Sequence, residues 1–478
     1  MEANIMLIKN GTVVTSQIVE KADIWIEGER IRAIEPNLHQ HVNASPPIID
    51  ATDMLIFPGG VDPHTHMDLS QGDDADPHCY QTGTRAAAYG GTTTIIAHLP
   101  FEQQKNPLQY QVDRHRRLAH SEALVDYGFH GVVDHVDSNI IADLKTFPRQ
   151  GITSVKFYMT YPVHLSDTSI LPLLEHAKHL GILLCAHCEN DAMIAYTEQK
   201  FKRRHRLQPR YQAALCPSIC EAEAVYRLCS MARLVDDVPL YLVHISSRSG
   251  LNAWREARRG APIVLETCPQ YLTLDDDLYQ TKNSNEPINE QALRYSACPP
   301  LRTLRDRDTL WQAIRCGEIA TVATDHCPIS FQEKRKGLYD VTRCPHGLPG
   351  IAARLPLLYT YGVIQRGMPL CRLVDLWSTN AAHCFGMYPT KGTIKKGCDA
   401  DLVLFDPNQH WKMTADQLHE DLDYTPYEGI TCIGKPIMTI LRGSIIVDHA
   451  TCVAKPGYGQ YIHRGPSDFS RLNTGLYS

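Results

Sequence analysis

The segment VDPHTHMDL, residues 61–69, carries two histidines, His64 and His66, that are separated by one residue. It follows an apolar run and the turn-forming sequence Pro58-Gly59-Gly60, a pattern typical of a buried β-strand. Successive side chains of a strand point to opposite faces, so residues i and i+2 share one face. Both imidazoles therefore point the same way, and the pair is either part of a metal site or two hydrogen-bonded histidines.

Four more ionisable residues each stand at the polar end of an apolar, strand-like run: Lys156, His187, His244 and Asp325. Taken singly, each has a structural explanation, because a histidine can be satisfied within a core and an aspartate can cap a helix. Burying so many ionisable groups together is unfavourable unless they coordinate something. Imidazole nitrogen and carboxylate oxygen suit Zn²⁺, with Mn²⁺, Co²⁺ and Fe²⁺ as alternatives.

The number of candidate ligands predicts two metal ions. A single catalytic zinc uses three protein ligands and an open position, and four histidines with one carboxylate exceed that set. Paired ions in such sites lie roughly 3.5–4 Å apart. Two dications would repel an ammonium, but addition of CO₂ to the neutral amine of Lys156 gives a carbamate that can bridge both ions. Lys156 is therefore a candidate ligand.

Eight apolar runs between residue 50 and about residue 330 would have to position these side chains, and segments of helical character such as 218–234 separate them. In chain order the runs are MLIFPGGVDPHTH, TTTIIAHLP, LVDYGFHGVV, ITSVKFYMTY, GILLCAHCEN, VPLYLVHISS, PIVLETCPQYL and IATVATDHCP. Strands that alternate with helices form parallel sheets with right-handed crossovers, and eight of them close into a barrel. We therefore predict an α/β fold, a (β/α)8 TIM barrel whose active site lies at the carboxyl ends of the strands.

The two ends of the chain have a different pattern, in which apolar and polar residues alternate between Gly, Asn and Pro. This pattern is typical of antiparallel strands. We predict that residues 1–56 and 389–454 pair into one small β-sandwich, with the catalytic barrel, residues 57–388, inserted between them. Residues 455–478 form a polar tail that we interpret as an arm for packing on a neighbouring subunit.

The composition excludes several classes of protein. Of the 478 residues, 43% are hydrophobic and 21% charged, as in soluble globular proteins, and the net charge of −6 provides no basic field for nucleic acid. No apolar stretch approaches the ~20 residues that span a bilayer, and no secretion signal opens the chain. The 16 cysteines are dispersed, which favours reduced, buried thiols. We expect a cytoplasmic protein that binds neither nucleic acid nor membranes.

Seven stretches, in this order, resemble the signature of the cyclic amidohydrolases: FPGGVDPHTH, VKFYMTY, AHCEN, YLVHISS, ETCPQYL, CPPLR and ATDHCP. Within that family the chain is most similar to the hydantoinase and dihydropyrimidinase branch, in particular the bacterial D-phenylhydantoinases, over nearly its whole length. The resemblance implies a barrel of the metal-dependent hydrolase type, a homotetramer and two Zn²⁺ per subunit, bridged by N6-carboxylated Lys156 and a hydroxide. The other ligands it implies are His64, His66 and Asp325 for one metal, and His187 and His244 for the second.

The resemblance also implies roles in catalysis. Asp325 would accept a proton as hydroxide attacks the ring carbonyl, and would return it to the departing amide nitrogen. Tyr161, five residues after the bridging lysine, would stabilise the oxyanion; its alternative role is packing on the barrel rim.

The chain departs from the family pattern at two positions that contact the substrate ring through the backbone. Cys298 replaces a serine before Pro-Pro-Leu-Arg, and His346 replaces an asparagine. Because main-chain atoms make these contacts, neither replacement need abolish binding, although His346 changes the turn chemistry and the charge of the rim. We also expect the loop after the histidine pair, with Asp73, Asp74 and Asp76, to help form the pocket wall, unless these carboxylates are simply solvated.

The function implied is zinc-dependent hydrolysis of the cyclic amide bond of 5-substituted hydantoins or dihydropyrimidines, which gives N-carbamoyl amino acids. Allantoinase is the main alternative, because its substrate is itself a substituted hydantoin. Dihydroorotases usually have an arginine two residues beyond His-x-His, where Asp68 stands and would repel an anionic substrate. A non-catalytic scaffold is least expected, because every metal ligand of the family is present.

Overall fold

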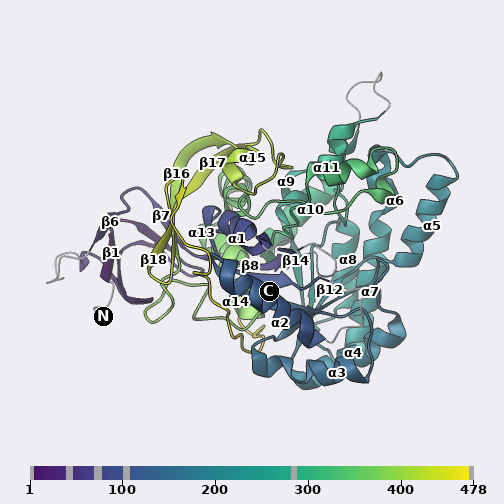
Figure 1. The fold of residues 1–478 in the computed structure, drawn as a ribbon, viewed down its shortest axis with the longest axis horizontal. Helices are drawn as coiled ribbons and strands as arrows, with labels where there is room; N and C mark the ends of the chain where they lie inside the picture. The colour runs from purple at the N-terminus through teal and green to yellow at the C-terminus, as the bar shows by residue number, and fades with distance from the viewer. Residues whose placement is uncertain (1–4, 39–46, 69–77, 101–107, 281–287, 473–478) are drawn as a thin grey trace.

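An eight-stranded parallel sheet forms the centre of the computed structural model, which describes residues 5–38, 47–68, 78–100, 108–280 and 288–472 (Figure 1). Its hydrogen-bonded order follows the chain from β8 to β15. The strands are β8 (Gly60–Thr65), β9 (Thr92–His98), β10 (Asp126–Val132), β11 (Ser154–Tyr158), β12 (Leu183–His187), β13 (Leu240–Leu242), β14 (Ile263–Thr267) and β15 (Ile319–Val322). Each corresponds to one of the eight predicted runs.

The first and last strands of this sheet meet and close the barrel. Thr65 forms a parallel bridge with His326, just beyond β15, and the amide of His66 donates to the carbonyl oxygen of His326 at 2.8 Å. The Thr324 hydroxyl donates to Asp62 of β8 at 2.7 Å. The predicted α/β barrel is confirmed.

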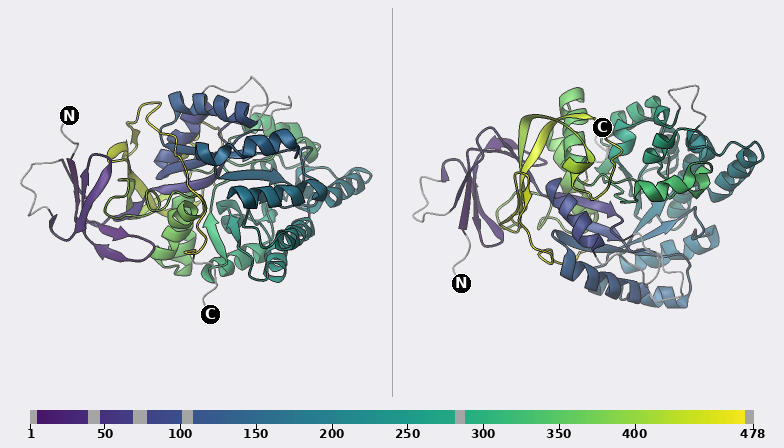
Figure 2. Two further views of the ribbon diagram at one scale, coloured as in Figure 1. Left: turned by 90° about the horizontal axis from the view of Figure 1, so that it is seen from below. Right: turned by 45° about the horizontal axis from the view of Figure 1, so that its top comes forward.

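Helices connect the strands and cover the outside of the barrel (Figures 1 and 2). The main ones are α1 (Cys79–Tyr89), α2 (Leu108–Glu122), α3 (Ser138–Leu144), α4 (Asp167–Leu180), α5 (Asp191–Lys202), α7 (Ser218–Leu234), α8 (Arg248–Ala257) and α10 (Leu304–Arg315). Shorter ones are α6 (Gln212–Leu215), α9 (Pro269–Thr273), α11 (Phe331–Lys334), α12 (Arg354–Leu357), η8 (Leu358–Ile364), α13 (Leu370–Val374), η9 (Asp375–Thr379), α14 (Asn380–Cys384) and α15 (Ala415–Leu418). Among the described residues, no helix is both long and apolar enough to cross a membrane.

Two further sheets pack together beside the barrel as a sandwich (Figure 1). One has the order β5-β4-β1-β6, with β1 (Ile5–Lys9), β4 (Asp23–Glu27), β5 (Arg30–Glu35) and β6 (Ile48–Asp50). The other has the order β19-β18-β17-β16-β7-β2-β3, with β2 (Thr12–Val14), β3 (Val19–Lys21), β7 (Leu55–Pro58), β16 (Leu402–Lys412), β17 (Thr431–Leu441), β18 (Ser444–Asp448) and β19 (Thr451–Cys452). Because β7 pairs with β16, the second sheet joins both ends of the chain, as predicted.

The turn between β7 and β8 carries the chain from the sandwich into the barrel at Gly59 and Gly60. A Cβ atom on Gly60 would lie 2.2 Å from the ring of Trp377, and one on Gly59 would lie 2.1 Å from the Thr93 hydroxyl. Only glycine fits this close approach of the backbone to its neighbours. The turn fixes where β8 begins, and hence where His64 stands.

Residues 455–472 of the tail pack on the barrel of their own chain (Figure 2), and the arm directed at a neighbouring subunit stays a prediction. The amide of Tyr127 donates to the carbonyl of Gln460, and that of Ile462 donates to the carbonyl of Tyr127. The buried Arg464 guanidinium donates to the Ser154 hydroxyl at 2.8 Å. Hydrogen bonds with β10 and β11 of the barrel hold this segment, so it forms part of the fold.

Candidate metal centre and active site

His64, His66 and Asp325 meet at the carboxyl ends of β8 and β15. The Asp325 Oδ1 atom lies 3.0 Å from His64 Nε2 and 3.2 Å from His66 Nε2. His64 is buried, and His66 is partly exposed. Two imidazole nitrogens and one carboxylate oxygen therefore converge, a donor set that suits a divalent transition metal.

His187 and His244 form a second group beside the first. Their ring centroids lie 4.5 Å apart, and the His244 ring lies 5.5 Å from that of His64. The buried Lys156 interacts electrostatically with Asp325 and with both Glu266 and His187. Burial lowers the pKa of Lys156, against the attraction of the two carboxylates, and so favours the neutral amine that CO₂ requires.

Three of the predicted site residues have left-handed backbone conformations. The φ angles are 39° at His244, 51° at Asp325 and 73° at Tyr161. Such angles are unfavourable for residues other than glycine, and they persist where the surrounding structure imposes them, most often at functional sites. The fold therefore holds these side chains in place at a cost in backbone strain.

His98, the last residue of β9, is a third histidine of the first group and is absent from the predicted set. Its ring centroid lies 4.4 Å from that of His64 and 5.0 Å from that of His66. Both ring nitrogens are buried without a hydrogen-bond partner, an arrangement that is costly unless something else binds them. One ligand atom from each of the three histidines lies within 4.8 Å of the others, so these residues fit a metal ion.

Glu266 of β14 forms hydrogen bonds with residues of both groups of histidines. Its Oε1 atom lies 2.7 Å from His64 Nδ1 and accepts a hydrogen bond from the amide of His244 at 3.0 Å. Its Oε2 atom accepts from the Tyr241 hydroxyl at 2.8 Å. A carboxylate on Nδ1 leaves the Nε2 atom of His64 free to bind a metal, as is usual for ligating histidines.

Glu189, the first residue after His187 and Cys188, plays a similar part for the second group. Its Oε2 atom lies 2.9 Å from His187 Nε2 and accepts from the Cys298 thiol at 3.2 Å. Its Oε1 atom accepts from the Cys216 thiol at 2.8 Å. Burial raises the pKa of Glu189, but the hydrogen bond and charge of His187, with Arg302, lower it to about 2.

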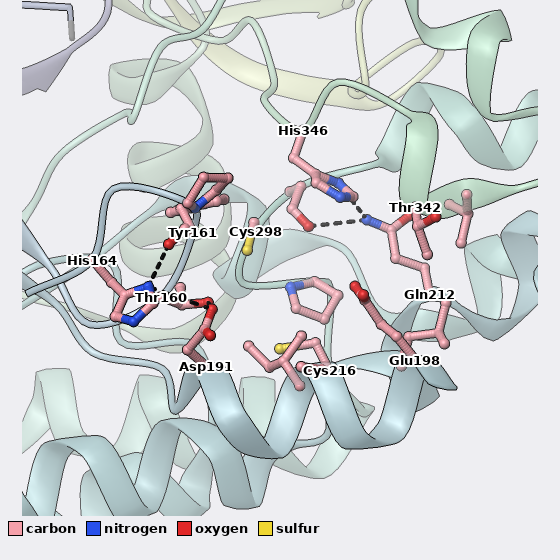
Figure 3. Close-up of a pocket in the computed structure, with 17 residues that line it drawn as sticks. Thr160, Tyr161, His164, Asp191, Glu198, Gln212, Cys216, Cys298, Thr342 and His346 are labelled. Carbon is pink, nitrogen blue, oxygen red and sulfur yellow. Dashed lines mark hydrogen bonds and ion pairs between the residues drawn. The ribbon is translucent and has the colours of Figure 1, made fainter. Parts of the chain in front are cut away.

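A cavity of about 480 Å³ adjoins the second group and contains Tyr161, Cys298 and His346 in its wall (Figure 3). Tyr161 connects the cavity to the second group of histidines, since its ring lies 5.1 Å from that of His187. His346 Nδ1 lies 3.2 Å from Gln212 Nε2, and burial lowers the pKa of this histidine to about 4. His346 is therefore uncharged at neutral pH, so it does not change the rim charge as we expected.

We expected Asp68 to repel an anionic substrate, and the loop with Asp73, Asp74 and Asp76 to help form the pocket wall. Asp68 is buried, with its carboxylate 3.7 Å from His115 of α2, so it has a partner within the protein. The expected wall residues Asp73, Asp74 and Asp76 lie outside the described residues.

The predicted set also lacks Glu189 and Glu266. All three additional residues stand in stretches already identified as strand ends, TTTIIAH, AHCEN and ETCPQYL. Their positions at those ends are the signal that could have revealed them.

Comparison with known proteins identifies the family of the chain. The model of the family described as "Amidohydrolase family" matches residues 55–446. The D-phenylhydantoinase of Escherichia coli O9:H4 (strain HS) is 39% identical over 465 residues, which cover 96% of this chain and 98% of the relative.

Solved structures are similar over the same length. The dihydropyrimidinase of Brevibacillus agri NCHU1002 has a TM-score of 0.91 at 35% identity, and the match covers 97% of this chain and 99% of that one. The D-hydantoinase of Bacillus sp. AR9 also has a TM-score of 0.91, at 36% identity, covering 96% and 99% of the two chains.

Proposed function

The chain belongs to the amidohydrolase family, and from this premise we propose that it hydrolyses the cyclic amide bond of 5-substituted hydantoins or dihydropyrimidines to give N-carbamoyl amino acids. The observation that carries the proposal is the convergence of His64, His66 and Asp325 beside a cavity that contains Tyr161. The relatives named above as hydantoinases and a dihydropyrimidinase support this class of substrate.

The metal would be zinc, two ions per subunit, with carboxylated Lys156 shared between them. The residues proposed to hold the ions are His64, His66, His187, His244 and Asp325, with His98 as a further donor. When bound, the ions lower the pKa of water toward about 7 and polarise the ring carbonyl. We further propose a cytoplasmic location and a homotetramer, and light scattering of the purified protein would test the tetramer.

Asp325 is the proposed proton carrier. Burial raises its pKa, but His64 and His66 hold the carboxyl well below its usual range, so it is ionised and can accept a proton from the attacking water. The same group then donates that proton to the amide nitrogen as the ring opens. The Asp325 Oδ1 atom lies 3.0 Å from His64 Nε2 and 3.2 Å from His66 Nε2, so the strand ends that position the two histidines also position this carboxylate.

Tyr161 is the proposed donor to the oxyanion that forms on the attacked carbonyl. Burial, together with Cys298 and Glu189, raises the pKa of Tyr161 well above its usual range, so the phenol keeps its proton. Its strained backbone and its contact with the His187 ring fix the hydroxyl in the cavity wall. Backbone groups at Cys298 and His346 would position the ring, as the resemblance implies.

The decisive experiment is steady-state kinetics with the zinc-loaded protein in bicarbonate. We would measure kcat/KM for D-5-phenylhydantoin, dihydrouracil and allantoin side by side. Preference for the aryl hydantoin would indicate a roomy exocyclic pocket, and preference for dihydrouracil a tighter one. Preference for allantoin would replace the proposed substrate, and no hydrolysis of any of the three by protein with a full metal content would overturn the proposal.

A further inference from the structure

One face of helix α5 forms a wall of the active-site cavity (Figure 3). The residues of this helix that line the cavity are Asp191, Ile194, Ala195 and Glu198. They stand at positions i, i+3, i+4 and i+7, which share one side of an α-helix. The wall therefore has an apolar middle and a carboxylate at each end.

The charge of the cavity wall is negative among the residues that the structure describes. Asp191 and Glu198 are its acidic residues, and no lysine or arginine lines it. Its two histidines are His346, which burial keeps neutral, and His164, which lies 3.9 Å from Asp191. Nothing in the described wall therefore balances the charge of Glu198.

Glu198 differs from Asp191 in having no partner among the residues that the structure describes. The Thr160 hydroxyl donates to Asp191 at 3.2 Å, whereas no described residue forms a hydrogen bond or ion pair with Glu198. The charges that act on the pKa of Glu198 are those of Asp191 and Asp340, both of which are negative. A half-buried carboxylate in such surroundings is stabilised by a cation.

We propose that Glu198 is a subsite for a positively charged exocyclic group, so that the preferred substrates are cyclic ureides whose side chain ends in an ammonium or guanidinium. The inference rests on the proposed function, which places the ring near Tyr161 and Cys298. The aliphatic part of the substrate's side chain would lie along Ile194 and Leu215, and its cationic end would meet the Glu198 carboxylate. Long cationic side chains combine an apolar stem with a charged end in the same way. The product would be the N-carbamoyl derivative of a basic amino acid.

The test compares 5-(4-aminobutyl)hydantoin with 5-pentylhydantoin, which have side chains of similar length and different charge. In the zinc-loaded Glu198→Gln variant, the ratio of kcat/KM for the cationic over the neutral substrate should fall about three- to tenfold, mainly through KM. Glu256→Gln makes the same change on the exposed face of α8, away from the cavity, and should leave the ratio as in the wild type.

An unchanged ratio in Glu198→Gln, with both hydantoins still hydrolysed, would overturn the subsite and leave the proposed function standing. If the wild type hydrolyses neither hydantoin, the subsite is tested by calorimetric titration with n-pentylguanidinium alone. Weaker binding to Glu198→Gln than to Glu256→Gln would then support the subsite without the proposed reaction, and equal binding would refute it.

Discussion

Glu266 shows how one buried side chain can organise a site without itself contacting the substrate. Its two oxygens join the His64 ring of β8, the Tyr241 hydroxyl of β13 and the backbone of His244, which follows β13. The carboxylate lies beyond reach of solvent, so these contacts are not exchanged for water. The orientation of the histidines therefore depends on a residue outside the set of proposed ligands.

The variant Glu266→Gln keeps the size of the side chain and removes one of its acceptor oxygens. Loss of an orienting carboxylate of this kind lowers metal affinity about 10- to 100-fold, and we expect a reduction of this size for zinc. Competition with a chelator, followed by measurement of zinc content, gives the affinity. Zinc affinity equal to that of Glu256→Gln would show that Glu266 serves packing alone.

Tyr161→Phe tests the proposed oxyanion donor. Removing one such donor costs about 10²- to 10³-fold in kcat, and KM should change little because the hydroxyl acts mainly in the transition state. Zinc content and circular dichroism would verify that the variant is intact. A kcat within a factor of about two of the wild type would assign Tyr161 to packing on the rim.

At the scale of elements, the short turn between β7 and β8 sets the position of His64 and His66. The turn at Gly59 and Gly60 begins β8 immediately after β7 ends at Pro58, whose carbonyl accepts from the Trp377 indole at 3.1 Å. The hydroxyl of Ser378 donates to the carbonyl of Gly59 at 2.6 Å. A shift of this turn would move the whole of β8 and its histidines.

The substitution Gly60→Ala puts a methyl group against Trp377. Overpacking of this kind costs about 1–3 kcal/mol in the free energy of unfolding, and the displaced strand should also bind zinc less tightly. Thermal unfolding and zinc content measure the two effects. Gly465→Ala is a suitable control, because its nearest contact would be at 3.4 Å; equal stability of the two variants would contradict the argument.

The loop after α15 carries a buried acid, Glu420, that makes stability depend on pH. The carboxyl accepts from the Ala352 amide at 3.3 Å, and its other oxygen is buried without a partner. Burial raises its pKa from 4.5 to about 8, although backbone hydrogen bonds oppose the shift. The folded state therefore binds this proton more tightly than the unfolded state does.

The stability that this proton contributes is fully present below pH 4.5 and is lost as the pH rises through about 8. The variant Glu420→Gln stays neutral, so we expect its free energy of unfolding to fall less between pH 5 and pH 9 than that of the wild type. Urea unfolding of the zinc-loaded proteins at several pH values measures the difference. Parallel curves would show that Glu420 titrates normally.

At the scale of the whole molecule, a buried ionic cluster joins the sandwich to the barrel. Lys391 Nζ lies 2.6 Å from Asp126 of β10, 2.9 Å from Asp399 and 2.7 Å from Asp401, which precedes β16. Arg442, after β17, also contacts Asp126. The three carboxylates resemble a metal site in composition, but the ammonium is the cation among them.

Lys391→Met leaves the three carboxylates without their shared cation. Breaking a buried ion pair in this way costs about 3–5 kcal/mol, and we expect a loss of that size in the free energy of unfolding. Urea unfolding measures it, with the exposed Lys396→Met as control. A loss below about 1 kcal/mol would mean that water or a rearranged Arg442 replaces the ammonium.

The sequence by itself determined the architecture, because the hydrophobic pattern of each segment specifies the type of strand or helix it forms. Eight apolar runs with polar ends specify parallel strands buried on both faces, and alternating runs at the termini specify strands with one buried face. The same reading predicted that His64, His66 and Asp325 would meet, since strand ends of a barrel share one rim.

Only the tertiary structure decided which other groups join them. His98, Glu189 and Glu266 stand at strand ends that the sequence identifies, but the sequence does not show which polar side chains there turn toward the histidines. Likewise, the role of Glu198 depends on which face of α5 turns toward the cavity, and the tail packs on its own barrel through backbone hydrogen bonds. Such contacts join residues far apart in the chain, so their geometry is fixed by packing rather than by local pattern.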